Sequence, residues 1–477
     1  MSNEQYCTIK DGILTGYSGT ESMVVIPEGV TAIGDGAFES CATLIGVIIP
    51  QGVTSIGESA FFKCENLSAV TIPDSVTSIG DAAFFECKSL VALHLPDGLI
   101  TIGECAFYGC EALIRLNIPE HITDIGRKAF YGCHGLADPE GFVIIRHRLF
   151  GYCGPGGAVV IPDGVIAIEE CALAGCERLT GLTIPESVTS IGRSAFDGCT
   201  NLARLTIPGS ITNIGPKAFI GCRQLADPEG FVTVNGHLFD YCGSQGHLVT
   251  PAGVTVISDE AFQGCDLLCT LTVSEGVTTI GKNVFNNCKG LLRVTIAHTV
   301  TSIGECAFHH CTGLTSITIP ESVTSIGTRC FASCRQLTSV TLSPTCTHIG
   351  AAAFSNCSAL ADRDGFVIVA NQLFQYTGSA AHVTVPQGVT IIHPIAFGRC
   401  ATITTVIIPD TVTAIGLMAF AVCPKLQHVV IPGSVTDIGR FAIVRDASIC
   451  APAGSYAETY ARENGLVFCR RLLTIAN

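Results

Sequence analysis

The chain has 477 residues, of which 48% are hydrophobic and 14% are charged, with no Trp and a formal net charge of −14. An acidic chain without a block of positive charge disfavours nucleic acid as a partner, because phosphate backbones would be repelled. The apolar residues come in bursts of three to five that Pro closes, far short of the roughly 18 residues of a membrane-spanning helix. The composition therefore predicts one long, narrow core and no membrane span.

The N-terminal residues predict a small cap. Residues 1–19 have neither a basic start nor an apolar stretch of 7–15 residues, so no signal peptide or anchor is visible. Asp11-Gly12 lies between apolar residues and is a strong signal for a two-residue turn. We therefore expect a hairpin cap over residues 1–22.

Residues 23–443 consist of an internal repeat. Sixteen units follow the pattern L-x-x-V-x-I-P-[DE]-[GS]-V-T-x-I-G-x-x-A-F-x-x-C, mostly at a spacing of 23 residues. A unit this short cannot bury its own apolar face, whereas stacked copies form a continuous core. The repeat position of Pro is filled by Pro27, Pro50, Pro73, Pro96, Pro119, Pro162, Pro185, Pro208, Pro251, Pro320, Pro386, Pro409 and Pro432, and by Ser274, Ala297 and Ser343.

Each unit predicts one coil. Ahead of Pro, the apolar Val70 and Ile72 alternate with Ala69 and Thr71, which is typical of a half-buried strand. Pro then sets a turn, and a second short extended segment ends at Gly. The Ala-Phe-x-x-Cys segment predicts a short helical turn. The predicted fold class is a repeat solenoid, a leucine-rich-repeat right-handed coil with parallel β-strands and short helical turns.

Three insertions interrupt the repeat. Each carries Phe-Val-x-Val or a close variant leading to Leu-Phe-x-Tyr, which predicts a hairpin; Asn235-Gly236 is a strong turn signal, whereas residues 146–147 and 371–372 are weak ones. The insertions lie near 137–157, 226–246 and 361–381. In the first coil after each, Glu169, Ser258 and His393 replace the repeat's Gly, so we expect altered stacking there.

Residues 444–477 predict a different, C-terminal cap. Ser455 is followed three residues later by Glu458, and then by Asn464-Gly465. This is the pattern of a short helix with a capping box and a Gly stop, placed to shield the last coil.

The pattern I-P-x-x-V-T-x-I-G-x-x-A-F-x-x-C-x-x-L resembles the BspA-type (Treponema pallidum-type) leucine-rich repeat over about residues 20–443. Known members are mostly surface or secreted proteins of bacteria and some protozoan parasites, and several bind host matrix proteins or other cells. The resemblance implies a non-enzymatic binding solenoid in adhesion or recognition, with no catalytic residues. Because no signal or anchor is visible, a cytoplasmic interaction scaffold is the alternative hypothesis.

The 26 Cys predict a buried thiol ladder. Fifteen of them occupy one repeat position beside the Phe, where Cys packs as a small hydrophobic residue. Their parallel Cβ vectors suit disulfide geometry poorly, although a disulfide framework remains the alternative. The ladder comprises Cys41, Cys64, Cys87, Cys110, Cys133, Cys176, Cys199, Cys222, Cys265, Cys288, Cys311, Cys334, Cys357, Cys400 and Cys423.

Two clusters resemble metal sites, but we expect no metal and no cofactor. Cys306, His309, His310 and Cys311 include zinc-ligand types. However, Cys311 belongs to the inward ladder and the adjacent His side chains should diverge. Residues 362–365 form only a fragment of a calcium loop. Nucleophile-elbow, metalloprotease and phosphate-loop motifs are absent from the sequence, which favours a non-enzyme.

The candidate binding surface is formed by the outward strand positions, two and four residues before each Pro. Most hold Thr, Ser, Ala or Gly, which suit either a solvated strand or a flat recognition face. Exposed Arg can anchor a partner or only prevent aggregation. We expect a protein or glycan partner, with acidic ones favoured. The candidate binding residues are Arg115, Arg204 and Arg293, at about 14 Å intervals by strand spacing, with His247, His382 and His428 in the same column.

Overall fold

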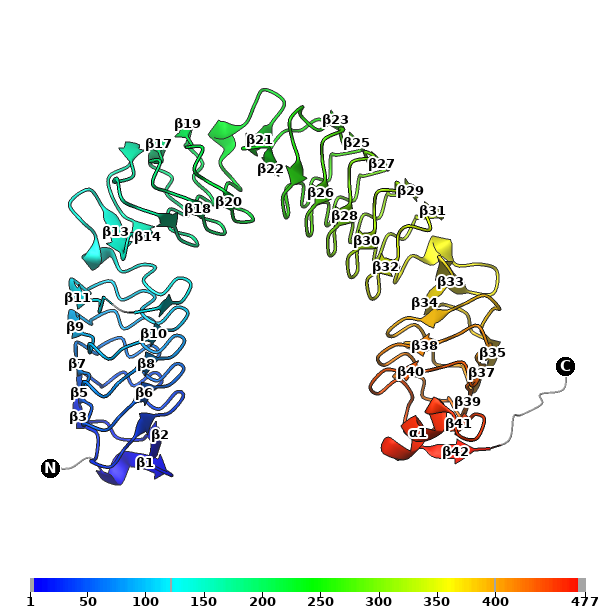
Figure 1. Ribbon diagram of the computed structural model, residues 1–477, viewed down its shortest axis with the longest axis horizontal. Coiled ribbons are helices and arrows are strands. Elements are labelled where there is room, and N and C mark those ends of the chain that lie inside the picture. Colours follow the sequence, from blue (N-terminus) through cyan, green and yellow to red (C-terminus); the bar gives the residue numbers. More distant parts are fainter. Residues whose placement is uncertain (1–3, 121, 399, 471–477) are drawn as a thin grey trace. The chain divides into compact units, whose positions relative to one another are not determined.

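The computed structural model describes residues 4–120, 122–398 and 400–470. The chain forms two compact units, residues 1–226 and 227–477. Within each unit the chain winds into stacked coils, and the fold is a parallel β-solenoid of about 20 turns with little helix (Figure 1). The predicted solenoid is therefore confirmed.

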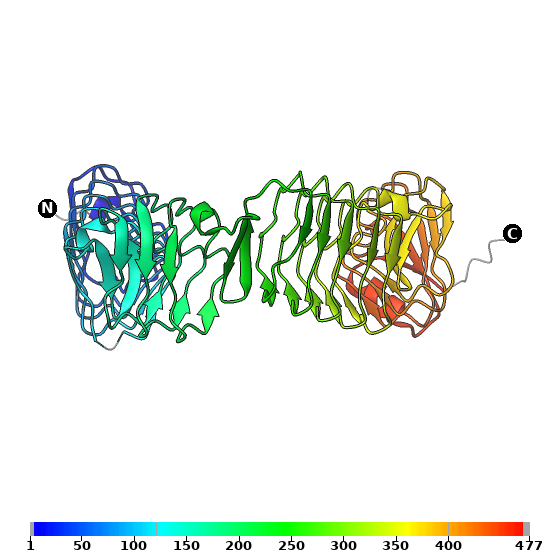
Figure 2. The ribbon, with the colours of Figure 1, turned by 90° about the horizontal axis from the view of Figure 1, so that it is seen from above.

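One row of strands lies directly ahead of the repeat prolines, and we call these the pre-proline strands. In β7 (Ala69–Thr71) Val70 is turned inward while its neighbours are exposed. Adjacent strands pair in parallel at the repeat spacing, so that Val47 lies beside Val70. Figure 2 shows such strands side by side in residues 247–341. The sheets are β3-β5-β7, β9-β11, β15-β17-β19, β23-β25-β27, β29-β31 and β35-β37-β39-β41-β42.

The other pre-proline strands are β3 (Met23–Val25), β5 (Gly46–Ile48), β9 (Ala92–His94), β11 (Arg115–Asn117), β15 (Gly157–Val160), β17 (Leu179–Thr183), β19 (Arg204–Thr206), β23 (His247–Val249), β25 (Thr270–Thr272), β27 (Arg293–Thr295), β29 (Ser316–Thr318), β31 (Ser339–Thr341), β35 (His382–Thr384), β37 (Thr405–Ile407) and β39 (His428–Val430).

A second row consists of two-residue strands after the proline turn, the post-proline strands. Their second residue is apolar and mostly buried, as Ile79 is in β8. They are β4 (Ala32–Ile33), β6 (Ser55–Ile56), β8 (Ser78–Ile79), β10 (Thr101–Ile102), β12 (Asp124–Ile125), β16 (Ala167–Ile168), β18 (Ser190–Ile191), β20 (Asn213–Ile214), β24 (Val256–Ile257), β26 (Thr279–Ile280), β28 (Ser302–Ile303), β30 (Ser325–Ile326), β32 (His348–Ile349), β36 (Ile391–Ile392), β38 (Ala414–Ile415) and β40 (Asp437–Ile438).

Antiparallel hairpins open four blocks of coils. The second strand of each pairs in parallel with the block's first post-proline strand, as Leu149 does with Ile168. Short 3-10 turns, Glu4–Tyr6, His134–Leu136, Arg223–Leu225 and Ser358–Leu360, precede them. The hairpins are β1 (Cys7–Lys10) with β2 (Ile13–Tyr17), β13 (Phe142–Ile145) with β14 (Arg148–Tyr152), β21 (Phe231–Val234) with β22 (His237–Tyr241), and β33 (Phe366–Val369) with β34 (Gln372–Tyr376).

The hairpin turns form even where the turn signal is weak. Arg146 and His147 adopt φ values of 53° and 63°, the left-handed conformation that Asn-Gly adopts more readily. In the last hairpin the left-handed residues are Ala370 and Asn371, one position earlier than the sequence suggested. Pairing and packing of the flanking strands therefore outweigh the local preference of the turn.

The Ala-Phe-x-x-Cys segment contradicts the prediction of a helical turn. Tyr108 N donates to Cys105 O (3.0 Å) and Cys110 N to Phe107 O (3.2 Å), whereas Phe107 N donates to Ala129 O of the next coil (2.8 Å). Cys105 has φ of 55°, outside the helical region. Alternate amides thus leave the coil, so a ladder of i to i−4 bonds cannot form. The segment is a series of tight turns bonded to the neighbouring coil.

The core is a stack of Phe rings, one from each coil except two, where Leu173 and Ile443 take the place of Phe. In the first block, Phe38, Phe61, Phe84, Phe107 and Phe130 lie nearly parallel, with centroids 5.0, 5.1, 5.3 and 5.5 Å apart. The hairpin residue Phe150 meets Phe130 edge-on at 87°. Phe374 meets Phe354 similarly, at 79°. Hairpins therefore continue the apolar core but end the parallel ring stack.

The repeat's Gly is required by close packing of consecutive coils. A Cβ on Gly304 would lie 2.5 Å from the carbonyl carbon of Gly281 in the preceding coil. After a hairpin the preceding coil is different, and a larger residue fits. There Glu169 accepts a hydrogen bond from Arg148 Nε of the hairpin, at 2.7 Å. The predicted change in stacking follows because the close backbone contact at the repeat's Gly is replaced by a side-chain contact between Glu169 and Arg148.

The ladder cysteines bond neighbouring coils. Cys110 Sγ donates to the carbonyl oxygen of Phe84 (3.2 Å), and Cys311 Sγ donates to that of Phe285 (3.0 Å). All 26 cysteines are free thiols, and 12 of the 15 ladder cysteines are buried. Burial raises the pKa of Cys64 to about 12. Most ladder positions are therefore buried thiols, as predicted, although hydrogen bonds with Cys222 and Cys400 lower the pKa of Cys199 and Cys423.

The C-terminal cap contains the expected helix and two strands that were not expected. Helix α1 (Tyr456–Glu463) begins after Ser455, whose side chain accepts from Glu458 N. Glu458 Oε2 in turn accepts from Gly454 N at 2.6 Å. Strands β41 (Ser448–Cys450) and β42 (Val467–Cys469) extend the last pre-proline sheet. The sheet therefore continues beyond the last repeat.

The thiol ladder leads to a titration experiment. Native protein without reductant should react at few thiols, led by the exposed Cys153 and Cys242, and denatured protein should react at many more. Cys153→Ser with Cys242→Ser should remove the fastest reacting fraction. Near-absence of reactive thiols after denaturation would mean that the ladder is bridged.

His393 leads to a prediction about pH. Burial lowers the pKa of His393 from 6.5 to about 4, with Nε2 donating to Gln372 Oε1 at 2.7 Å. The unfolded chain therefore takes up this proton at higher pH than the folded chain. The contribution of His393 to stability is complete above pH 6.5 and is lost as the pH falls towards 4, by at most about 3 kcal/mol.

In urea unfolding between pH 7 and pH 4, His393→Gln should flatten the pH dependence of the free energy of unfolding. The exposed His348 provides the control, since His348→Gln should leave the profile close to that of the parent protein. Equal pH profiles for the parent and the His393 variant would contradict the assignment.

Candidate functional site

The pre-proline strands present a flat row of outward side chains. In most of these strands a buried or half-buried central residue is flanked by two exposed ones, as in β7, β27 and β29. Thr and Ser are the commonest residues at the exposed positions, which also hold apolar residues such as Val25, Val160 and Val249. We call this surface the pre-proline face.

The structure places all six candidate residues at the first position of pre-proline strands. Five are exposed, and the sixth, His428, is half-buried because its Nδ1 is hydrogen-bonded to Ser448 Oγ at 2.7 Å. The exposed ones are Arg115, Arg204, Arg293, His247 and His382.

The structure brings some of the six together and separates others. His247, Thr270 and Arg293 lie in one row across β23-β25-β27, with His247 Nδ1 2.8 Å from Thr270 Oγ1. His382 and His428 flank Thr405 in another row. The three arginines, however, lie in three different sheets. A hairpin lies between each pair of arginines along the chain, and the spacing of about 14 Å stays a prediction.

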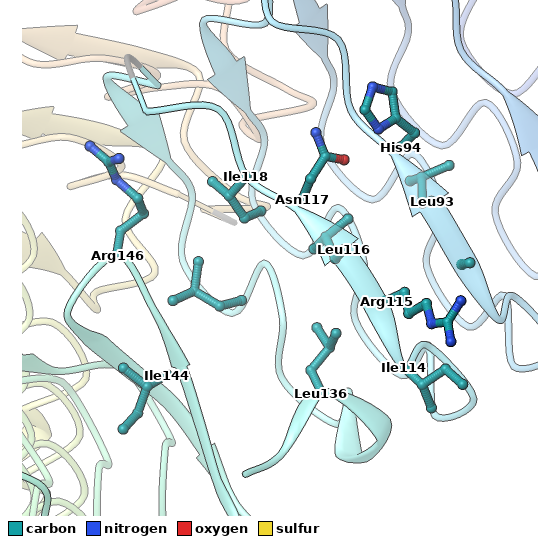
Figure 3. Close-up of a pocket in the computed structure, with 12 residues that line it drawn as sticks. Leu93, His94, Ile114, Arg115, Leu116, Asn117, Ile118, Leu136, Ile144 and Arg146 are labelled. Carbon is teal, nitrogen blue, oxygen red and sulfur yellow. The ribbon is translucent and has the colours of Figure 1, made fainter.

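A cavity of about 820 Å³ lies beside β11, and we call it the β11 cavity. Figure 3 shows Ile118, Leu136 and Ile144 around it, with Arg115 and Arg146 at opposite sides. Its walls come from β9, β11, the 3-10 turn His134–Leu136 and the first interior hairpin. The lining residues are Ala92, Leu93, His94, Ile114, Arg115, Leu116, Asn117, Ile118, Leu136, Ile144, Ile145 and Arg146.

The cavity exists because the hairpin β13-β14 adds no strand to the pre-proline sheet that ends at β11. β14 joins β16 on the post-proline side, and the next pre-proline strand, β15, begins a new sheet. The position that a neighbouring strand would occupy beside β11 is therefore open. Leu116 and Ile118 are half-buried, whereas the matching Leu93 and Leu95 are 4% and 0% exposed.

Two arginines make the cavity rim positive. Among the described residues neither Arg115 nor Arg146 has a carboxylate within ion-pair distance. The sequence predicted Arg115 as a binding residue but assigned Arg146 only to a weak turn. The apolar wall was also missed, since Ile114, Leu116 and Ile118 fit the repeat pattern and carry no signal of their own.

The cavity offers groups for binding, namely an apolar wall that includes Leu116 and Leu136 and the guanidinium donors of Arg115 and Arg146. The lining contains His94 and two Arg but no Ser, Thr, Cys, Lys or carboxylate that could act as a nucleophile beside a base.

In the described part of the chain no three His, Cys, Asp or Glu side chains are grouped to hold a metal ion. The ring centroids of His309 and His310 lie 4.2 Å apart at 82°.

Comparison with known protein families shows to which family the chain belongs. Residues 9–137, 143–229, 232–361 and 367–449 match the family described as "BspA type Leucine rich repeat region (6 copies)". The chain belongs to the BspA-type leucine-rich repeat family. The family and its solenoid fold are in general non-enzymatic, and their repeats point to a role in protein interaction.

Solved structures include similar BspA-type chains. A leucine rich cell surface protein from Faecalibacterium prausnitzii is 30% identical, with 76% of this chain and 90% of that chain covered and a TM-score of 0.37. A Bacteroides ovatus leucine-rich repeat protein is 26% identical, with 74% and 90% covered and a TM-score of 0.33. The leucine rich repeat protein of T. pallidum is 26% identical, with 47% and 89% covered and a TM-score of 0.29.

Among curated proteins, none matches this BspA-type chain. Across residues 4–120, 122–398 and 400–470, no helix has the length and apolar character to cross a membrane.

Proposed function

We propose that this BspA-type chain is a non-enzymatic binding solenoid that acts in adhesion or recognition at a bacterial or protozoan surface. It would hold a protein or glycan partner on the pre-proline face. The observation that carries the proposal is the set of exposed arginines on a face of short polar side chains, in a chain whose formal net charge is −14.

The free state of these arginines supports this assignment. Lys88 and Lys282, elsewhere on the coils, pair with Glu65 and Glu305 at 2.9 and 3.8 Å. Within the described residues Arg204 and Arg293 have no such partner on the pre-proline face. An acidic partner would meet guanidinium donors without competing carboxylates, which favours charge-assisted hydrogen bonds.

A second function is favoured by one observation. All 26 cysteines are free thiols, and such thiols persist more readily in a reducing compartment. An intracellular interaction scaffold would use the same face without a surface role. Cell fractionation, with surface biotinylation of intact cells, separates the two functions.

The binding face can be tested with Arg204→Glu combined with Arg293→Glu. Binding of the full chain to an array of extracellular-matrix proteins and anionic glycans should weaken at least tenfold, because two charge-assisted contacts are reversed. Circular dichroism should not change, since both side chains point away from the core.

The matched control is Arg193→Glu with Arg329→Glu, two exposed arginines outside the pre-proline strands with the same change of charge. It should retain binding. Equal affinity of both double variants, with both folded, would place the binding surface elsewhere on the coils.

A further inference from the structure

Strand β11 has a free edge. Among the described residues it pairs only with β9, on the side of the preceding coil. An unpaired strand edge offers a row of backbone donors and acceptors to another chain. Natural proteins usually cover such edges, and here the neighbouring hairpin leaves the β11 cavity in that position.

Comparison with other coils shows that β11 lacks one hydrogen bond to the described residues of a following coil. The residue before the repeat proline normally donates its amide to the next coil, as Ile49 N does to Thr71 O (3.2 Å). The matching amide in the fifth coil is that of Ile118, which lines the cavity. No described residue accepts from it. A buried or half-buried amide without a partner costs free energy that an incoming strand would recover.

The cavity also has an apolar wall suited to side chains of such a strand. Leu116 and Ile118 are half-buried at the end of the core, and Leu136 and Ile144 face them from the following residues. Ile114 is 57% exposed beside them. In an added strand alternate side chains would point into this wall, and the others would point to solvent.

Charge identifies the kind of strand that fits. Arg115 lies on β11 itself and Arg146 on the hairpin across the cavity, both without a carboxylate partner in the described residues. Of the other block-end strands, β31 has Ser339 and Thr341 at its outward positions, whereas β19 has Arg204 and Thr206. The β11 edge therefore combines open backbone, apolar wall and positive rim.

We propose that an extended segment of an acidic partner protein adds as a strand to the free edge of β11. Its apolar side chains would enter the β11 cavity, and its carboxylates would contact Arg115 and Arg146. This proposal rests on the proposed binding function and names the class of partner. A glycan oxygen could accept from Ile118 N, but a glycan has no periodic peptide groups with which to extend the sheet along β11.

A second copy of this chain fits the edge less well. Two β11 edges pairing with each other would bring Arg115 of both copies to one interface, and like charges across paired strands are destabilising. The apolar wall of the cavity does not distinguish the two occupants, because any apolar strand would bury it equally well. Charge therefore selects a foreign, acidic segment.

The test uses random ten-residue peptides displayed on phage and selected on the full chain. Selected peptides should alternate Val or Ile with Asp or Glu. Synthetic copies should bind at least tenfold more weakly to Arg115→Glu with Arg146→Glu, and to Leu136→Trp, which fills the cavity. N-methylation of one alternate set of peptide amides should abolish binding, and N-methylation of the other set should not, because only one set faces β11.

The matched control is Arg127→Glu with Arg193→Glu, two exposed arginines that follow the repeat's Gly. It should bind the peptides like the parent. The proposal is overturned if no peptide is selected, or if the folded β11 variants bind the peptides as tightly as the parent. It is also overturned if anionic glycans bind at the β11 cavity and the peptides do not displace them. Concentration-dependent dimers that block the peptides would also overturn it.

Loss of array binding by the Arg204 and Arg293 variant tests the proposed function separately. That variant should still capture the selected peptides. If that variant binds the array like the parent and still captures the peptides, the result counts against the proposed function but not against the β11 proposal.

Discussion

Hydrogen bonds between consecutive coils determine this structure. In strands, in the tight turns around the Phe residues and at most ladder thiols, the donor lies in one coil and the acceptor in a neighbouring coil. These bonds require that every coil have the same path, which restricts the repeat to 23 residues and places Gly where backbones nearly touch. A coil is therefore stable only beside a neighbour of the same form.

The hairpins interrupt this arrangement with consequences for binding. They continue the apolar core through Phe150 and Phe374, but they turn the Phe stack and add strands only to the post-proline side. Before the three interior hairpins the pre-proline sheets end at β11, β19 and β31, and they are also divided between β7 and β9 and between β27 and β29. The same insertion that separates Arg115 from the arginines of later blocks creates the cavity beside it. The proposed β11 site thus lies where the repeat is interrupted.

The sequence was sufficient to predict the coils, hairpins, thiol ladder and capping helix, because each has a periodic or local signal. It could not predict that the Phe segment forms turns, since the alternative partner, Ala129 for Phe107, lies in another coil. It placed Arg115 on an exposed strand position. The β11 cavity was missed because Leu116 and Ile118 match the repeat, and only the absent neighbour exposes them.

The central claim is that hydrogen bonds between coils protect the amides within each pre-proline sheet and are missing where a sheet ends, as it does at β11 and β31. Hydrogen–deuterium exchange of the free chain, followed by mass spectrometry of overlapping fragments, measures this directly. The amides of Ile49 and Ile319, bonded to Thr71 O and Thr341 O, should exchange at least tenfold more slowly than those of Ile118 and Leu342 at block ends. Equal protection at interior and block-end positions would contradict the account.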